Sequence, residues 1–274
     1  MNTEMPEHSG ETEDDYEVLA VRYATRLTRN SLIFLNFHFY EESDESRQMD
    51  FFFWILRNSR RTIIVDTGFT PEVGERRGRA ITCAPAEALQ RLGIDPESVE
   101  HVVLTHAHYD HTGNVGLFPS AQVVISAREL EFWTGPYAGR EQFAHDVEAQ
   151  DMNLLAELSA LGRITRVGES HRIAPNVDLI EVGGHTPGQL VVVVHSSTGS
   201  VILASDALHF YDELEHDRPF TVLTDLPGMY RSLDQLRELR DAPGAVLVAG
   251  HDPDVMRRFP PLDPADPGLG VRVA

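Results

Sequence analysis

Short apolar runs separated by polar or glycine-rich breaks recur along the whole chain. Runs of about four to eight residues rich in Val, Ile and aromatic side chains are typical of strands. In the first half they predict strands over 18–23, 31–37, 51–56, 62–65, 102–105 and 122–126. Apolar residues at helical spacing predict helices over 85–92, 128–133 and 141–161.

The second half repeats this alternation. Strands are predicted over 177–182, 190–195, 201–204 and 245–249, with a helix over 230–240. Two β-rich halves that each carry helices predict an α/β fold with four layers, in the order helix, sheet, sheet, helix. We expect one domain over 16–259, between a disordered N-terminal tail (1–15) and a Pro-rich C-terminal tail (260–274).

Composition narrows the classes of function. The formal net charge of -20 opposes binding to nucleic acids and to anionic membrane surfaces, because both depend on clustered positive charge. No apolar run is long enough to span a membrane, and 1–15 lacks the apolar core of a signal peptide, so a cytoplasmic protein is expected. The single cysteine, Cys83, excludes an intramolecular disulfide and a Cys-based zinc cluster. All 23 basic residues are arginines, which excludes catalysis by lysine.

Four side chains of the types that bind zinc lie within six residues, directly after the strand predicted over 102–105. They are His106, His108, Asp110 and His111. Zinc takes imidazole nitrogen and carboxylate oxygen as ligands. Several buried imidazoles without a cation are costly, so the cluster predicts a metal site. Further candidate ligands follow later strands, namely His185, Asp206 and His251.

The motif around the cluster, Thr-His-Ala-His-Tyr-Asp-His-Thr-Gly at 105–113, resembles the signature of the metallo-β-lactamase superfamily. Four more motifs of that family follow the expected order: Val-Asp-Thr-Gly at 65–68, Gly-His-Thr-Pro-Gly at 184–188, Ser-Asp at 205–206 and Gly-His at 250–251. The resemblance implies an α/β fold, the four-layer αβ/βα sandwich of the metallo-β-lactamase type. Within the superfamily the chain looks most like the N-acyl homoserine lactonase-like branch.

By this resemblance each chain binds two metal ions. One ion would be held by His106, His108 and His185, the other by Asp110, His111 and His251, and Asp206 would be shared. The di-iron branch of the family is expected to carry a glutamate at the position of His108, so two Zn²⁺ are favoured, with iron or manganese as alternatives. Asp66 would orient a histidine ligand through a hydrogen bond, or would serve only as a turn residue before Gly68.

The resemblance implies a dinuclear zinc-dependent hydrolase, in which a metal-bridging hydroxide attacks the carbonyl of a small lactone or ester. Asp110 would carry a proton to the leaving group. Lactonases of this branch have a tyrosine three residues after the shared aspartate, where this chain has His209. We expect His209 or Tyr211 to contact the substrate in its place. The candidate residues of the substrate pocket are Phe69, Trp133 and Tyr137.

Other functions stay open from the sequence. A glyoxalase-II-like thioesterase or an amide hydrolase would use the same seven ligands. A non-catalytic protein that keeps the metal and only binds a ligand is an alternative of a different class, and a single-iron oxygenase is a third. The expected partner is a small-molecule carbonyl substrate, and a homodimer is left open.

Overall fold

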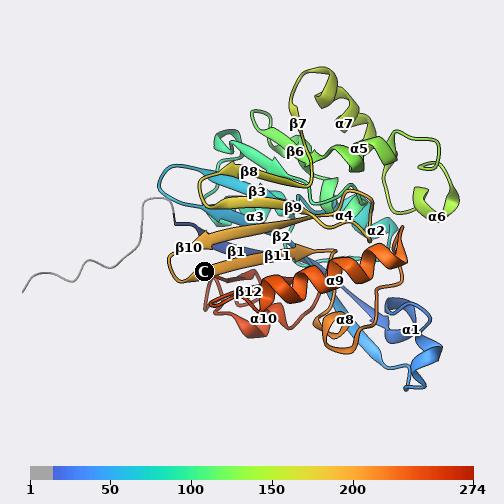
Figure 1. Cartoon of the computed structure of the whole chain (residues 1–274). Helices are drawn as coiled ribbons and strands as arrows, with labels where there is room; N and C mark the ends of the chain where they lie inside the picture. Colours follow the sequence, from blue (N-terminus) through green and yellow to red (C-terminus); the bar gives the residue numbers. More distant parts are fainter. Residues whose placement is uncertain (1–14) are drawn as a thin grey trace, which may run out of the picture.

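A computed structural model describes residues 15–274, and in it two sheets pack face to face with helices on both outer sides (Figure 1). The larger sheet contains β1 (Glu17–Arg29), β2 (Ser46–Arg57), β3 (Thr62–Val65), β4 (Ala80–Ile81), β5 (His101–Val103), β6 (Gln122–Ser126), β7 (Ile164–Val167) and β13 (Gly270–Arg272). The smaller sheet contains β8 (Ser170–Ala174), β9 (Val177–Glu181), β10 (Leu190–Ser196), β11 (Gly199–Ser205) and β12 (Val246–Ala249).

The helices are short except for two. They are α1 (Asn30–Ile33), α2 (Pro71–Arg76), α3 (Pro85–Arg91), α4 (Tyr109–Thr112), α5 (Ala127–Trp133), α6 (Glu141–Ala144), α7 (Ala149–Ala160), α8 (Tyr211–His216), α9 (Leu226–Arg240) and α10 (Val255–Arg258). Helices α3, α5 and α7 cover the outer face of the larger sheet, and α9 covers that of the smaller one. The four-layer α/β sandwich predicted from the sequence is therefore confirmed.

The central strand β2 is buried on both faces. Phe52 and Trp54 face the smaller sheet, while Phe51 and Phe53 face the helical layer, and all four side chains are at most 1% exposed. A fully buried aromatic side chain contributes about 1.5–3 kcal/mol to stability, so this strand anchors both cores. Burial on both faces explains why its sequence is a continuous apolar run and not an alternating one.

Parallel pairing brings the chemistry to one edge of the sandwich. Strands β3, β5 and β6 run parallel in the larger sheet, as do β11 and β12 in the smaller one. The carboxyl ends of parallel strands meet at the same edge, so the loops after them lie together.

Three sequence predictions differ from the structure. The strand over 31–37 is wrong: this segment forms α1 and the 3-10 helix η1 (Phe37–Tyr40), and Phe34 makes only an isolated bridge with Phe220. Ile33, Phe34 and Phe37 are buried in the same apolar cluster as β1 and β2 without pairing in a sheet, whereas Leu32 is 61% exposed. The helix over 141–161 is interrupted between α6 and α7, where the Asp146 carbonyl accepts the N–H of Tyr109 at 2.8 Å.

The third difference concerns the expected C-terminal tail. Residues 270–272 form β13, which pairs antiparallel with β1 and buries Val271 completely. The expected N-terminal tail lies outside the described residues, apart from Asp15. None of the helices in 15–274 combines the length and apolarity that a bilayer crossing requires.

Candidate metal centre

Loops at the shared strand edge carry all seven candidate ligands. The loop after β5 delivers His106 and His108 and leads into α4, which carries Asp110 and His111. His185, Asp206 and His251 lie in the loops after β9, β11 and β12. Gly184 has a φ of +87°, and a Cβ there would lie 2.6 Å from the Met229 backbone, so only glycine lets the His185 loop pack this close to α9.

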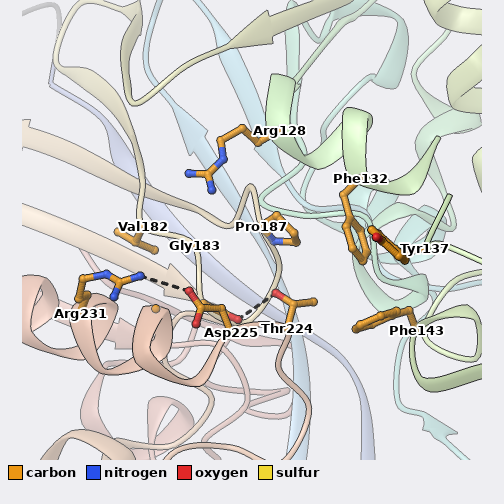
Figure 2. A pocket seen from close by; sticks show the side chains of 12 residues that line it. Arg128, Phe132, Tyr137, Phe143, Val182, Gly183, Pro187, Thr224, Asp225 and Arg231 are labelled. Carbon is orange, nitrogen blue, oxygen red and sulfur yellow. Dashed lines mark hydrogen bonds and ion pairs between the residues drawn. The ribbon is translucent and has the colours of Figure 1, made fainter. Parts of the chain in front are cut away.

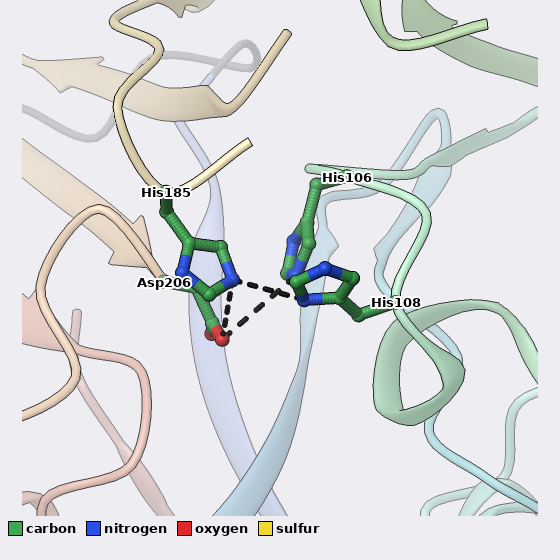
Figure 3. A group of neighbouring side chains, drawn as sticks. All are labelled: His106, His108, His185 and Asp206. Atoms are coloured by element: carbon green, nitrogen blue, oxygen red, sulfur yellow. Dashed lines mark hydrogen bonds and ion pairs between the residues drawn. The ribbon is translucent and has the colours of Figure 1, made fainter. Parts of the chain in front are cut away.

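The ligands form two groups of side chains that could each hold a metal ion. Their potential ligand atoms lie within 4.8 Å of one another in each group, and all seven residues are buried. The first group, drawn in Figure 3, consists of His106, His108, His185 and Asp206. The second group consists of Asp110, His111 and His251.

Asp206 lies between the two groups. Its Oδ2 is 3.4 Å from His185 Nε2 and 3.8 Å from His106 Nε2, on the side of the first group. Its Oδ1 is 3.1 Å from His251 Nε2 and 3.3 Å from His111 Nε2, on the side of the second. Each carboxylate oxygen therefore faces a different group, which is the arrangement expected of a ligand shared by two ions.

Hydrogen bonds at the far nitrogens fix which ring atom faces the centre. His111 Nδ1 lies 2.8 Å from Asp66 Oδ2, His251 Nδ1 lies 2.8 Å from the Asp50 carbonyl, and His185 Nδ1 lies 2.8 Å from the Val222 carbonyl. Each of these contacts leaves Nε2 free to act as a ligand. His108 is the exception, because its Nδ1 lies 3.0 Å from His185 Nε2 and so faces the centre.

Unpartnered atoms show that a cation fits this donor set. In residues 15–274, buried ligand atoms with no hydrogen-bond partner include Nε2 of His106, His111 and His251 and Oδ1 of Asp206. Burial without a partner is costly for such atoms, and a divalent ion would satisfy several at once. Burial also holds the pKa of His106 and His108 well below the usual value and lowers that of His185 to about 3, so these imidazoles are neutral and can bind a cation.

The sequence profile of the metallo-beta-lactamase superfamily matches residues 52–251, nearly three quarters of the chain. The chain belongs to the metallo-beta-lactamase superfamily. This confirms the resemblance seen in the sequence motifs.

Several relatives of the chain are N-acyl homoserine lactonases. The chain is 31% identical to lactonase AttM of Azorhizobium caulinodans over 183 residues, which is 62% of this chain but only 65% of the length of that relative. It is 27% identical to lactonase AiiB of Agrobacterium fabrum over 222 residues, covering 73% of this chain and 78% of AiiB. A structure of an N-acyl homoserine lactone hydrolase with N-hexanoyl-L-homoserine at its metal centre has 18% identity, covers 91% of this chain and 98% of its own, and superposes with a TM-score of 0.74, which shows a shared fold.

From the sequence, Asp66 has two alternative roles, orienting a histidine ligand or making a turn before Gly68. In the structure its carboxylate lies below the ligands and makes several hydrogen bonds. Besides His111, it accepts the backbone N–H of Thr105 at 2.8 Å and the hydroxyl of Ser205 at 3.2 Å. Its φ of +61° is strained for a residue other than glycine, so it also makes the turn after β3. The two roles are therefore combined in one residue.

Glu129 on α5 was missed by the sequence analysis. Its fully buried carboxylate accepts the N–H of Ala107 at 3.0 Å, the N–H of Gly188 at 3.0 Å and the indole N–H of Trp133 at 2.7 Å. Ala107 lies between His106 and His108, and Gly188 lies in the His185 loop, so one side chain holds the two loops that carry the histidines of the first group. Ser126 and Glu129 have the spacing of a helix capping box, which conceals this role in the sequence.

His209 lies beside Asp206. Its Nε2 is 3.0 Å from Asp206 Oδ2, its Nδ1 is 3.4 Å from Glu213 Oε1, and its ring stacks on Phe220 at 3.7 Å. Burial lowers its pKa, but Asp206 and Glu213 outweigh this and raise the pKa to about 9.

Tyr211, the other residue expected to contact the substrate, points away from the ligand groups. It begins α8 with its ring in the core, and its hydroxyl donates to the Leu247 carbonyl at 3.2 Å, away from the ligand groups. Phe69 is likewise fully buried, with its ring 4.9 Å from that of Tyr23, so it supports the site from within the core and does not line an open pocket.

A cavity of about 460 Å³ opens beside the loop that carries His185. Figure 2 shows its aromatic side, formed by Phe132, Tyr137 and Phe143, facing Thr224, Asp225 and Arg231. Thr224 donates to the Gly184 carbonyl at 3.1 Å, so this wall is bonded to the His185 loop. Tyr137 thus lines this cavity, whereas Trp133 lines a separate cavity of about 480 Å³ between α5 and α7, with its ring 5.7 Å from that of His108.

Proposed function

We propose that this chain is a metal-dependent hydrolase that opens small lactones, with one zinc ion in each ligand group. The position of Asp206 is the observation that carries the proposal, because its two oxygens face two separate sets of unpartnered donor atoms. The names of the relatives support a lactone as the substrate class. Neutral imidazole and carboxylate ligands support zinc over softer metals.

Two divalent ions bound here would supply an activated water and polarise the substrate carbonyl. The chain's own residues then set the geometry. Asp206 fixes the separation of the two groups, and the contacts of Asp66 and Glu129 keep the histidines in place. His209 Nε2, next to Asp206 Oδ2, is positioned to donate a hydrogen bond to an oxygen of the substrate.

Asp110 is the residue proposed to move the proton. Hydrolysis adds water across the acyl C–O bond, so the ring oxygen leaves as an alkoxide that must be protonated. The Asp110 carboxylate lies 3.7 Å from His111 Nε2 and 3.8 Å from His251 Nε2, at the edge of the second group. This looser placement suits a residue that transfers a proton as well as binding.

The cavity beside His185 would accept the rest of the substrate. Its aromatic wall suits an acyl chain or another apolar substituent, and its volume lies in the range of small-molecule pockets. N-acyl homoserine lactones of increasing chain length are therefore the first substrates to test, followed by unsubstituted lactones and esters.

The test is turnover by protein that has been stripped with a chelator and reloaded with a defined metal. We expect lactone hydrolysis to disappear on stripping and to return with zinc at about two ions per chain. Asp110→Asn, reloaded to the same metal content, should lower kcat by about a hundredfold or more. If manganese or iron restored far more activity than zinc, the assignment of zinc would be wrong. If the protein hydrolysed thioesters or amides but no lactones, the assignment of lactones as the substrate class would be wrong.

A further inference from the structure

Two arginines lie side by side next to the metal centre. Strands β1 and β4 pair in the register Ala24–Ile81 and Thr25–Ala80, and Arg26 and Arg79 come next along the two strands, where continuing this register would set them opposite each other. The charge of Arg79 acts on Arg26, which agrees with this placement. Residues directly opposite in an antiparallel pair point to the same face of the sheet. Two guanidinium groups therefore share one face of β1.

On this face of β1, Arg79 contacts a residue that neighbours two of the candidate metal ligands. Arg79 Nε donates to the hydroxyl of Tyr109 at 3.1 Å, and Tyr109 stands between the ligands His108 and Asp110. The Arg79 guanidinium also lies 5.9 Å from the ring of Phe51, which packs 5.0 Å from the ring of His251.

Neither arginine has an acidic partner within ion-pair distance among residues 15–274, although Asp and Glu outnumber Arg in the chain by 43 to 23. Their neighbours Arg76 and Arg77, by contrast, both pair with Glu148. The Nε of Arg26 is buried and has no hydrogen-bond partner.

Electrostatics agree with this geometry. Burial lowers the pKa of Arg26, and the charge of Arg79 lowers it further, whereas Tyr109 and Asp110 raise it. Two like charges at a partly buried site cost free energy unless an anion accompanies them. Asp110 is the nearby carboxylate, but it belongs to the second ligand group, so an external anion is the remaining candidate.

We infer that Arg26 and Arg79 form an anion-binding subsite beside the metal centre, and that the substrate is a lactone or ester carrying a carboxylate. Planar guanidinium groups match a carboxylate in shape and hydrogen-bonding pattern. The carboxylate would lie near Tyr109, and the scissile carbonyl would lie between the two ligand groups. The lactone or ester part of this inference rests on the proposed function, whereas the anion-binding subsite does not.

The test is therefore a binding measurement that needs no turnover. Metal-loaded protein is titrated by calorimetry with tetrahydrofuran-2-carboxylate, a lactone-sized ring without the scissile carbonyl, and with its neutral carboxamide. We expect the carboxylate to bind more tightly than the carboxamide, and Arg26→Gln and Arg79→Gln each to weaken carboxylate binding by about ten- to hundredfold. Arg26→Lys, which keeps the charge, should lose less.

Arg166→Gln is the matched control, because Arg166 too has no acidic partner within 15–274 but lies on β7 and donates to Ser159 Oγ at 3.2 Å. It should bind both probes as wild type does. Equal carboxylate binding by wild type, Arg26→Gln and Arg79→Gln would show that only the metal holds the probe and would overturn the subsite. Stronger binding of inorganic phosphate than of the carboxylate, dependent on both arginines, would overturn the carboxylate assignment.

A turnover assay separates this inference from the proposed function. For a lactone with a free carboxylate and its carboxamide analogue, the ratio of their kcat/KM values should fall about ten- to hundredfold in Arg79→Gln. If the wild-type protein hydrolysed no lactone but still bound the carboxylate in a way that depends on the arginines, the proposed lactonase activity would be wrong and the anion-binding subsite would stand. Melting temperatures identify any variant that fails to fold, and the other arginine variant then decides the outcome.

Discussion

The two ligand groups meet at Asp206 but are supported from different parts of the fold. The second group rests on the larger sheet, where Asp66 at the end of β3 holds His111 and the Asp50 carbonyl of β2 holds His251. The histidines of the first group come from two loops, and Glu129 from the helical layer holds both. A sheet positions ligands through its own register, whereas loops need an added buried contact to reach the same precision.

The groups also differ in charge. Burial keeps the imidazoles of the first group neutral, as their lowered pKa values indicate. In the second group burial lowers the pKa of His111, but Asp206, Asp66 and Asp110 together outweigh it and raise the pKa well above its usual value. The first group is therefore ready to bind a cation, and the second must release a proton first.

Removing the shared ligand should produce the largest effect. Asp206→Ala takes one oxygen from each group, so we expect both ions to be lost and kcat/KM for a lactone to fall by about a thousandfold or more. Metal analysis of the purified variant, with lactone turnover alongside, measures this. Asp206→Asn, which keeps the shape but not the charge, is the matched variant, and retention of two ions by the Ala variant would refute a shared ligand.

Separate supports predict separate losses. Asp66→Asn should weaken the ion of the second group and Glu129→Gln that of the first, each by about ten- to hundredfold in affinity. Competition with a chelator on cobalt-loaded protein, followed by its absorption spectrum, resolves the two sites. If either variant lowered the metal affinity of both groups equally, the two groups would be coupled, and the idea that they have separate supports would be wrong.

The strand-end position of the ligands could be predicted from the sequence because it depends on local patterns. An apolar strand followed by a dense His/Asp motif is visible along the chain, and so is the order of the later motifs. Glu129 could not be found this way, because two of its partners, Ala107 and Gly188, come from segments before and after it that only the folded chain brings together. The segment 31–37 failed for a related reason, since apolar content reports burial and not strand pairing.

Asp206 shows the same limit within the site itself. Its motif predicted a shared ligand, but only the folded structure shows which oxygen faces which group. The direction of Tyr211 was also hidden, because a tyrosine in the first turn of a helix can point into the core or toward the site.

A change of pH should separate the two groups by their protonation. His111 has a raised pKa and must lose its proton to bind a cation, so affinity at the second group should rise with pH, by about tenfold per pH unit below that pKa. The neutral histidines of the first group should show a much weaker dependence over the same range. Zinc titrations between about pH 6 and pH 8 measure this, and equal slopes for both sites would contradict the difference in charge.

The smallest expected effects distinguish the two residues that the sequence offered as substrate contacts. His209 lies 3.0 Å from the oxygen of Asp206 that faces the first group, so His209→Gln should lower kcat for a lactone by about tenfold. Tyr211→Phe removes a buried hydroxyl that donates to the Leu247 carbonyl and accepts the Ala249 N–H at 3.4 Å, so it should cost about 1 kcal/mol of unfolding free energy and leave kcat unchanged. Denaturant unfolding and steady-state kinetics on both variants give the two readouts. A drop in kcat for Tyr211→Phe that matched the drop for His209→Gln would mean that helix α8 transmits the geometry of the core to the first group, which its contacts do not predict.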